Sequence, residues 1–191
     1  MITDKQVTDI SKFLSLVLRH HPEKIGIDID HRGWTDVQEL LEKVNKHGIQ
    51  IDIDLLRYVV ATNSKKRFAF NDTGDKIRAS QGHSLDVELG YTVQTPPAIL
   101  YHGTSEKSVQ SILRMGIEKR TRQHVHLSND IETALKVGQR HGKPIVFRVF
   151  SGKMHADGFQ FYLSENRVWL TDHVPSGFLQ PEDDITSRNG I

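Results

Sequence analysis

Apolar residues recur at helical spacing near the start of the chain, in a segment that ends KFLSLVLRHHPE. The apolar positions are Ile10, Phe13, Leu14, Val17 and Leu18. This spacing places them on one face of an α-helix that packs on a core. The pattern stops at Arg19, His20 and His21, and Pro22 disfavours the helical conformation for the residue before it. Cations in a last turn also complement the carbonyl end of a helix, so this ending is open to a purely structural interpretation.

Two more helices and a hairpin follow in the first half of the chain. The segment GWTDVQELLEKVNKHG predicts a helix with Thr35 as its N-cap and Gly48 just past its end, and DIDLLRYVVATN predicts another from about residue 54. The alternating runs of KKRFAFNDTGDKIRAS, joined by NDTG, are typical of a β-hairpin. Three helices and a hairpin favour a winged-helix module over residues 1–95. Such a module binds nucleic acid or serves as a plain interaction domain.

The pattern changes after the TPP segment, where residues 96–191 are predicted to form a second domain. Strands are expected in AILYHGT, HVHLS, PIVFRVF, FQFYL and RVWLT. Helices are expected in SEKSVQSILRMG, with Ser105 as its N-cap, and from about residue 130 to 140. The sequence therefore predicts an α+β protein with a mixed, strand-rich second domain.

Composition narrows the class of protein but not its chemistry. The 191 residues are 37% hydrophobic and include no cysteine, which excludes a disulfide framework and a thiolate metal site. The chain lacks an apolar run long enough to span a bilayer and a signal-peptide core, so a soluble cytoplasmic protein is expected. A formal charge of +1 gives no global basic field, so any anion site must be local. Eleven histidines suit metal binding, proton transfer or hydrogen bonding equally well.

Two short motifs in the second half are candidates for ligand binding. In YHGTS, His102, Gly103 and Thr104 could contact a ribose and a carboxamide or phosphate, but an ordinary strand-to-helix turn explains them as well. In HVHLS, His124 and His126 point to one side of a strand. Further metal ligands are missing from the neighbouring sequence, so two histidines at the edge of the core are favoured over a metal site. The chain contains neither a G-x-G-x-x-G nor a Walker A sequence, which argues against Rossmann and P-loop nucleotide sites.

Six motifs taken together identify a resemblance that none of them carries alone. SKFLSLVLRHHPE, KKRFAF, IRASQGHS, YHGT, RQHVHLS and VWLT, in this order, resemble the RNA 2′-phosphotransferases, or tRNA 2′-phosphotransferases, of bacteria, over about residues 11–179. The resemblance implies an N-terminal winged-helix lobe that faces RNA and a C-terminal lobe similar to ADP-ribosyltransferases that holds NAD.

The implied reaction removes an internal 2′-phosphate from RNA in two steps. The phosphate first attacks the ribose carbon that bears nicotinamide, which gives an RNA 2′-phospho-ADP-ribose intermediate. The 2″-hydroxyl of the attached ADP-ribose then attacks phosphorus and releases RNA 2′-OH and ADP-ribose 1″,2″-cyclic phosphate. NAD is consumed as a co-substrate, and no metal is implied.

The resemblance also carries residue roles over by motif. The implied catalytic residues are Arg19, His20, Arg67 and Arg122. Three permanently charged, forked side chains suit a phosphate with up to two charges, and a histidine can exchange a proton with the reacting oxygens. His21 matches no functional position and is interpreted as local structure.

The implied contacts to NAD lie mainly in the second domain. They are His102, Gly103, Thr104, His126, Ser128 and Val168. Val168 stands where many ADP-ribosyltransferases have a catalytic glutamate, and an apolar residue fits a nucleophile that is already an anion. Arg78, Gln81 and His83 of IRASQGHS are expected to contact NAD or RNA phosphates, with a polar linker as the alternative. His124 departs from the tyrosine that is frequent in bacterial members.

The expected partners are a 2′-phosphorylated, tRNA-like RNA of the kind that tRNA splicing produces, and NAD, with no membrane and the protein acting as a monomer. Two alternatives stay open at this stage. One is a non-catalytic RNA-binding winged helix joined to a nucleotide-sensing domain, and the other is an ADP-ribosyltransferase that modifies nucleic-acid phosphates and stops after the first step.

Overall fold

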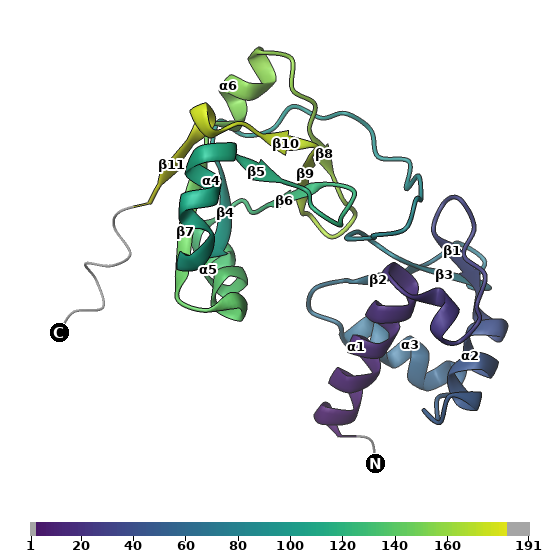
Figure 1. Ribbon diagram of the computed structural model, residues 1–191. Coiled ribbons are helices and arrows are strands. Elements are labelled where there is room, and N and C mark those ends of the chain that lie inside the picture. The colour runs from purple at the N-terminus through teal and green to yellow at the C-terminus, as the bar shows by residue number, and fades with distance from the viewer. Residues whose placement is uncertain (1–2, 183–191) are drawn as a thin grey trace. The chain divides into compact units, whose positions relative to one another are not determined.

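The computed structural model describes residues 3–182, and the chain divides between Gly90 and Tyr91 into two compact units (Figure 1). Each unit combines helices with antiparallel strands, so the chain is an α+β protein as predicted. Within the described range, every helix is too short or too polar to cross a membrane.

The first unit packs three helices against one small sheet. Its elements are α1 (Asp4–Arg19), the 3-10 helix η1 (Pro22–Lys24), β1 (Trp34–Asp36), α2 (Val37–Lys46), α3 (Ile53–Thr62), β2 (Phe68–Phe70) and β3 (Lys76–Ala79). The sheet is antiparallel, with the strand order β1-β3-β2. Leu14 and Leu18 of α1 are completely buried together with Leu40, Leu56 and Ile77, so the apolar face predicted for the first helix forms part of the core.

The cap of α1 fixes where that helix begins. Thr3 Oγ1 accepts a hydrogen bond from the backbone N–H of Gln6, and the side chain of Gln6 accepts one from the backbone N–H of Thr3. This reciprocal pair satisfies two of the backbone donors that a helix start leaves unpaired. α1 therefore starts at a fixed residue and carries its apolar face through four turns to Arg19.

The start of α2 differs from the prediction. Asp36, and not Thr35, is its N-cap, and the carboxylate of Asp36 accepts a hydrogen bond from the backbone N–H of Glu39. Thr35 lies in β1, opposite Ile77 of β3, and only 2% of it is exposed. The three-residue strand β1 was not predicted, because its pairing with β3 is a contact between distant parts of the sequence. The hairpin of β2 and β3 is confirmed.

The second unit is built from short strands and small helices. Its elements are β4 (Leu100–Ser105), η2 (Glu106–Ser108), α4 (Val109–Met115), β5 (Ile117–Glu118), β6 (Val125–Leu127), α5 (Ile131–Gly138), η3 (Gln139–His141), β7 (Pro144–Val149), α6 (Ser151–Ala156), β8 (Tyr162–Leu163), β9 (Trp169–Thr171), β10 (His173–Val174), η4 (Ser176–Phe178) and β11 (Leu179–Pro181). They form three antiparallel sheets, with the orders β11-β7-β4, β6-β9-β8 and β10-β5. Phe147, Phe161, Leu100 and Met154 are fully buried at the centre of this unit.

The strands predicted for the second unit are present, but one helix begins later than expected. Ser105 ends β4 and is the N-cap of the 3-10 helix η2, as its predicted capping role requires, but α4 itself starts only at Val109, with Ser108 as its N-cap. Gly116 ends α4 with a φ of +83°, a conformation that glycine adopts without strain. The helix α6 was not predicted.

Candidate functional site

Arg19 and His20, at the end of α1, are fixed by contacts with distant segments of the first unit. The backbone N–H of Ser84 donates to Arg19 O at 3.0 Å, and His20 Nδ1 lies 3.0 Å from Ser84 Oγ. Ser84 Oγ also lies 3.4 Å from Arg19 O. When the single Ser84 hydroxyl proton is donated to Arg19 O, Ser84 Oγ accepts from His20 Nδ1–H, and the lone pair of the imidazole is then on Nε2. Ser84 is therefore a positioning residue that the sequence did not reveal.

Arg67, just before β2, is oriented by a chain of hydrogen bonds that reaches back to α1. Arg67 Nη1 donates to Asn63 Oδ1 at 3.3 Å, and Asn63 Nδ2 donates to Ser11 Oγ at 2.8 Å. Ser11 is buried in α1, with 7% of its surface exposed. Arg19 Nη2 in turn lies 3.5 Å from Arg67 O. The structure therefore brings the predicted residues Arg19, His20 and Arg67 together through Ser84, Asn63 and Ser11.

A shallow groove runs beside this cluster. It has a volume of about 400 Å³ and lies between α1 and the segment that ends α3 and leads to β2. Its lining includes three cations, Lys12, Arg19 and Arg67, together with serine, threonine and asparagine side chains and the apolar residues Val7 and Val59. None of the described residues that line it is acidic. The groove is thus locally cationic in a chain of nearly zero net charge.

His83 is a deeply buried member of the predicted site residues, with 1% of its surface exposed. Neither ring nitrogen has a hydrogen-bond partner among the described residues. The pKa of His83 is lowered from 6.5 to about 4, chiefly by burial and in smaller part by the nearby charges of Arg19, His20 and Arg78. The imidazole is therefore neutral at physiological pH.

This burial predicts a loss of stability in mild acid. The unfolded chain protonates His83 near its ordinary pKa of 6.5, while the folded protein resists protonation down to about pH 4. The unfolded state therefore binds more protons between these values, and the free energy of unfolding falls as the pH drops below about 6.5. We expect His83 to account for about 2 kcal/mol of the loss between pH 7 and pH 5.

Urea denaturation of the wild type and of His83→Leu at these two pH values measures this contribution. Leucine cannot bind a proton, so the difference between pH 7 and pH 5 should shrink by that amount in the variant. Equal pH dependence of the two proteins would show that the folded protein protonates His83 as readily as the unfolded chain does.

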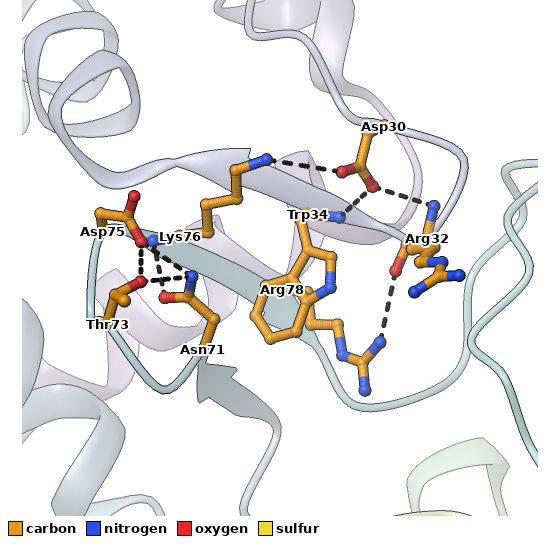
Figure 2. Close-up of polar contacts among 8 residues, drawn as sticks. All are labelled: Asp30, Arg32, Trp34, Asn71, Thr73, Asp75, Lys76 and Arg78. Carbon is orange, nitrogen blue, oxygen red and sulfur yellow. Dashed lines mark hydrogen bonds and ion pairs between the residues drawn. The ribbon is translucent and has the colours of Figure 1, made fainter.

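Arg78 and Gln81 lie on and just after β3. The Arg78 guanidinium is 4.4 Å from the centre of the Trp34 ring, and its Nη1 donates to Arg32 O at 3.4 Å (Figure 2). Trp34 and Arg78 face each other across the β1–β3 pair, so the sheet register creates this cation–π contact. Gln81 is half-buried, and its Oε1 has no hydrogen-bond partner among the described residues.

His21 stands outside this cluster of cations. Its Nδ1 lies 2.9 Å from Glu23 Oε1 in an exposed pair at the start of η1. The pair lowers the pKa of the Glu23 carboxyl, chiefly through the hydrogen bond from His21. The position agrees with the interpretation of His21 as local structure.

In the second unit, His102, His126 and Arg122 form a connected set. His102 Nδ1 lies 3.1 Å from His126 O, so Nδ1 carries the proton and donates it, which leaves the lone pair of the ring on Nε2. Arg122 Nη1 donates to His126 Nδ1 at 3.0 Å. Burial lowers the pKa of His102, which keeps its imidazole neutral. The predicted set thus contains an acceptor held in place, His102 Nε2, and the guanidinium of Arg122.

The remaining predicted residues of this unit surround the junction of β4 and β6. Tyr101 and Ser128 exchange two backbone hydrogen bonds, of 2.9 and 2.8 Å, which join the two strands. Thr104 is buried in β4, opposite Ile145 of β7. Val168 directly precedes β9, and its backbone is held by Ser164. Gly103 faces α5, where a Cβ would meet Ala134 O at 1.7 Å.

His124 takes part in an aromatic cluster. Its ring lies edge-on to Tyr162 at 5.5 Å and to Tyr91 at 6.1 Å. Burial lowers the pKa of His124, as expected for a histidine at the edge of a core. Among residues 3–182, no group of three or more histidine, aspartate or glutamate side chains is arranged to hold a metal ion.

Comparison with known proteins identifies the family. The sequence pattern of the "RNA 2'-phosphotransferase, Tpt1 / KptA family" matches residues 4–173. A "Probable RNA 2'-phosphotransferase" of Flavobacterium johnsoniae is 58% identical over 171 residues, which cover 90% of this chain and 94% of the relative. A protein of the same description from Agrobacterium fabrum is 52% identical over 95% of this chain and 98% of its own length. One from Fusobacterium nucleatum is 51% identical over 90% of this chain and 96% of its own length. The chain therefore belongs to the RNA 2′-phosphotransferase family.

Proposed function

We propose that this protein removes an internal 2′-phosphate from RNA and passes it to NAD. A phosphate oxygen forms a bond to C1″ of the nicotinamide ribose, and the bond from that carbon to nicotinamide breaks. The ribose 2″-hydroxyl oxygen then bonds to phosphorus, and the bond to the RNA 2′-oxygen breaks. The RNA oxygen takes up a proton, and the products are RNA 2′-OH, nicotinamide and ADP-ribose 1″,2″-cyclic phosphate.

The observation that carries this proposal is the cluster of Arg19, His20 and Arg67 beside a groove lined by cations, in a member of this family. Arginine is the side chain best suited to grip a phosphate with two parallel hydrogen bonds. Both guanidinium groups would bind the 2′-phosphate and stabilise the charge that grows on it in the second step. His20 would take the proton from the attacking hydroxyl or return it to the departing oxygen.

The second unit fits the proposed binding of NAD. His102 Nε2 is a fixed, neutral acceptor and therefore suits a ribose hydroxyl. Arg122 supplies a further cation for phosphate, and His126 and Ser128 add polar atoms nearby. Val168 puts an apolar side chain at a position where a carboxylate would repel the phosphate nucleophile. NAD supplies the electrophilic carbon that receives the phosphate.

We further propose that the first unit is a winged-helix lobe that faces RNA and that the second is related in fold to ADP-ribosyltransferases. The three helices and the antiparallel sheet of the first unit support the former. The small antiparallel sheets around β4, β6 and β9, which carry the proposed NAD residues, support the latter. A tRNA-like RNA is the proposed substrate class, and the enzyme is proposed to act as a cytoplasmic monomer.

The contact between Arg122 and His126 gives a direct test of the role of His126. Because His126 Nδ1 accepts from Arg122 Nη1, we expect His126→Asn, whose amide oxygen can take the place of Nδ1, to keep at least about ten times more activity than His126→Tyr. Steady-state rates with NAD and 2′-phosphorylated RNA measure this. Better retention of activity by the tyrosine variant would instead show that ring stacking is the function of His126.

The reaction itself is tested with NAD and a short RNA that carries one internal 2′-phosphate, by following RNA mass and nicotinamide release together. Loss of one phosphate with an equal amount of nicotinamide is the expected result. A persistent RNA-phospho-ADP-ribose adduct would mean that the protein stops after the first step. RNA binding with neither change would mean that the protein is a non-catalytic RNA-binding protein.

A further inference from the structure

The groove extends beyond the arginines that bind the proposed 2′-phosphate. Lys12 and Arg19 both line it, and both come from α1. Arg19 is seven positions after Lys12, which is about two helical turns. Their side chains therefore leave the helix on the same face, about 10 Å apart along its axis. The groove is therefore cationic at two separate places.

The wall between these two places offers hydrogen-bonding groups without opposing charge. Ser15 of α1 lies between Lys12 and Arg19, Thr8 lies one turn before Lys12, and Ser64 lies on the other side of the groove, after α3. α1 and α3 form the two flanks and lie in contact (Figure 1). Lys12 has one acidic neighbour, Asp9, at 3.4 Å outside the lining. The two side chains are 74% and 58% exposed, so this pair is weak and can exchange for a stronger anion.

An internal 2′-phosphate is never alone on an RNA chain. The phosphodiesters that flank the modified ribose lie within one or two nucleotides of it, and each carries one negative charge. With the 2′-phosphate on Arg19 and Arg67, the RNA strand can place a flanking phosphodiester at Lys12 by following the groove along α1.

We propose that the part of the groove around Lys12 is a subsite for a phosphodiester that flanks the 2′-phosphate. This inference rests on the proposed function and deepens it, because it distinguishes a 2′-phosphate inside an RNA strand from one on a single nucleotide. Lys12 contributes binding energy and not chemistry, so it governs affinity for RNA and leaves kcat nearly unchanged. Phosphate contacts of this kind do not read the base sequence.

Binding in the absence of NAD tests the subsite without depending on turnover. The probe is a short single-stranded RNA with one internal 2′-phosphate, and its partner is the same RNA with neutral methylphosphonate linkages on both sides of the modified nucleotide. We expect Lys12→Gln to weaken binding of the first RNA about tenfold at low salt and binding of the second less than about twofold. The slope of log affinity against log salt should fall by about 0.7 for the first RNA, the value for one phosphate contact on a single strand.

Two matched variants control for charge and for helix stability. Lys12→Arg keeps the cation and should restore binding, whereas Lys5→Gln removes an exposed lysine of the same helix outside the groove and should bind like the wild type. Equal weakening of both RNAs by Lys12→Gln, or unchanged binding of the natural RNA, would overturn the subsite.

The inference and the proposed function can fail separately in these experiments. A wild type that binds 2′-phosphorylated RNA through Lys12 but releases no phosphate with NAD would retain the subsite and disprove the reaction. The opposite result is also possible to recognise. If the wild type removes the phosphate but Lys12→Gln binds both RNAs as the wild type does, the reaction is established and the subsite is disproved.

Discussion

Replacement of Arg67 by lysine is expected to lower kcat for phosphate removal at least about a hundredfold, while the free energy of unfolding stays within about 1 kcal/mol of the wild type. Arg67 Nη1 is held by Asn63 Oδ1 at 3.3 Å, and Asn63 is held by the buried Ser11. These hydrogen bonds orient the planar guanidinium of Arg67, and a guanidinium can bind two oxygens of one phosphate with its forked N–H groups. Lysine keeps the charge but has neither the plane nor the fork, so the loss appears in the reaction and not in folding.

Single-turnover rates and urea denaturation of the same preparation separate these two effects. Arg57→Lys is the matched control, because Arg57 is an exposed arginine of the same unit that pairs only weakly with Asp54. It should leave both quantities unchanged. Full activity of Arg67→Lys would show that charge alone is needed and that the bidentate role assigned to Arg67 is wrong.

A second large effect is expected for Gly103→Ala, this time on folding. An added Cβ would lie 1.7 Å from Ala134 O and 2.5 Å from Ala134 C, so the backbone of α5 would have to move away from β4. Backbone cannot rotate aside as a flexible side chain does, and overpacking of this severity costs about 3 kcal/mol or more. We expect the free energy of unfolding to fall by at least this amount, or the second unit to lose its cooperative transition.

Gly177→Ala is the control for this substitution. Gly177 has no atom within 4 Å of its added Cβ, and its φ is outside the left-handed region, so its replacement should change stability by less than about 0.5 kcal/mol. Chemical denaturation without NAD compares the two variants. A stable Gly103→Ala protein would mean that α5 can shift without cost. The close approach of α5 to β4 at Ala134 explains why YHGT has a glycine at position 103. The proposed contact of Gly103 with NAD then involves only its backbone atoms.

The outlines of both units could be predicted from the sequence because they depend on local interactions. The apolar spacing of α1, the NDTG turn of the hairpin and the strand around HVHLS are visible within a few neighbouring residues. The boundaries were less certain, since competing caps lie side by side: Thr35 and Asp36 both suit a helix start, and the pairing of β1 with β3 decides in favour of Asp36.

The sequence by itself determined the family, because six motifs in a fixed order can be read without knowing any contact. The resemblance then implied Arg19, His20, Arg67 and Arg122 as the catalytic residues, the first three of which lie in the first unit. Only the tertiary structure revealed what holds them. Ser84 lies 64 residues from His20, and Asn63 lies 52 residues from Ser11, yet each pair is joined by a hydrogen bond. Serine and asparagine are common at helix ends and in loops, so neither stands out in the sequence. Their roles depend on which distant segments the packed core brings within hydrogen-bonding distance, and local spacing along the chain does not encode that approach.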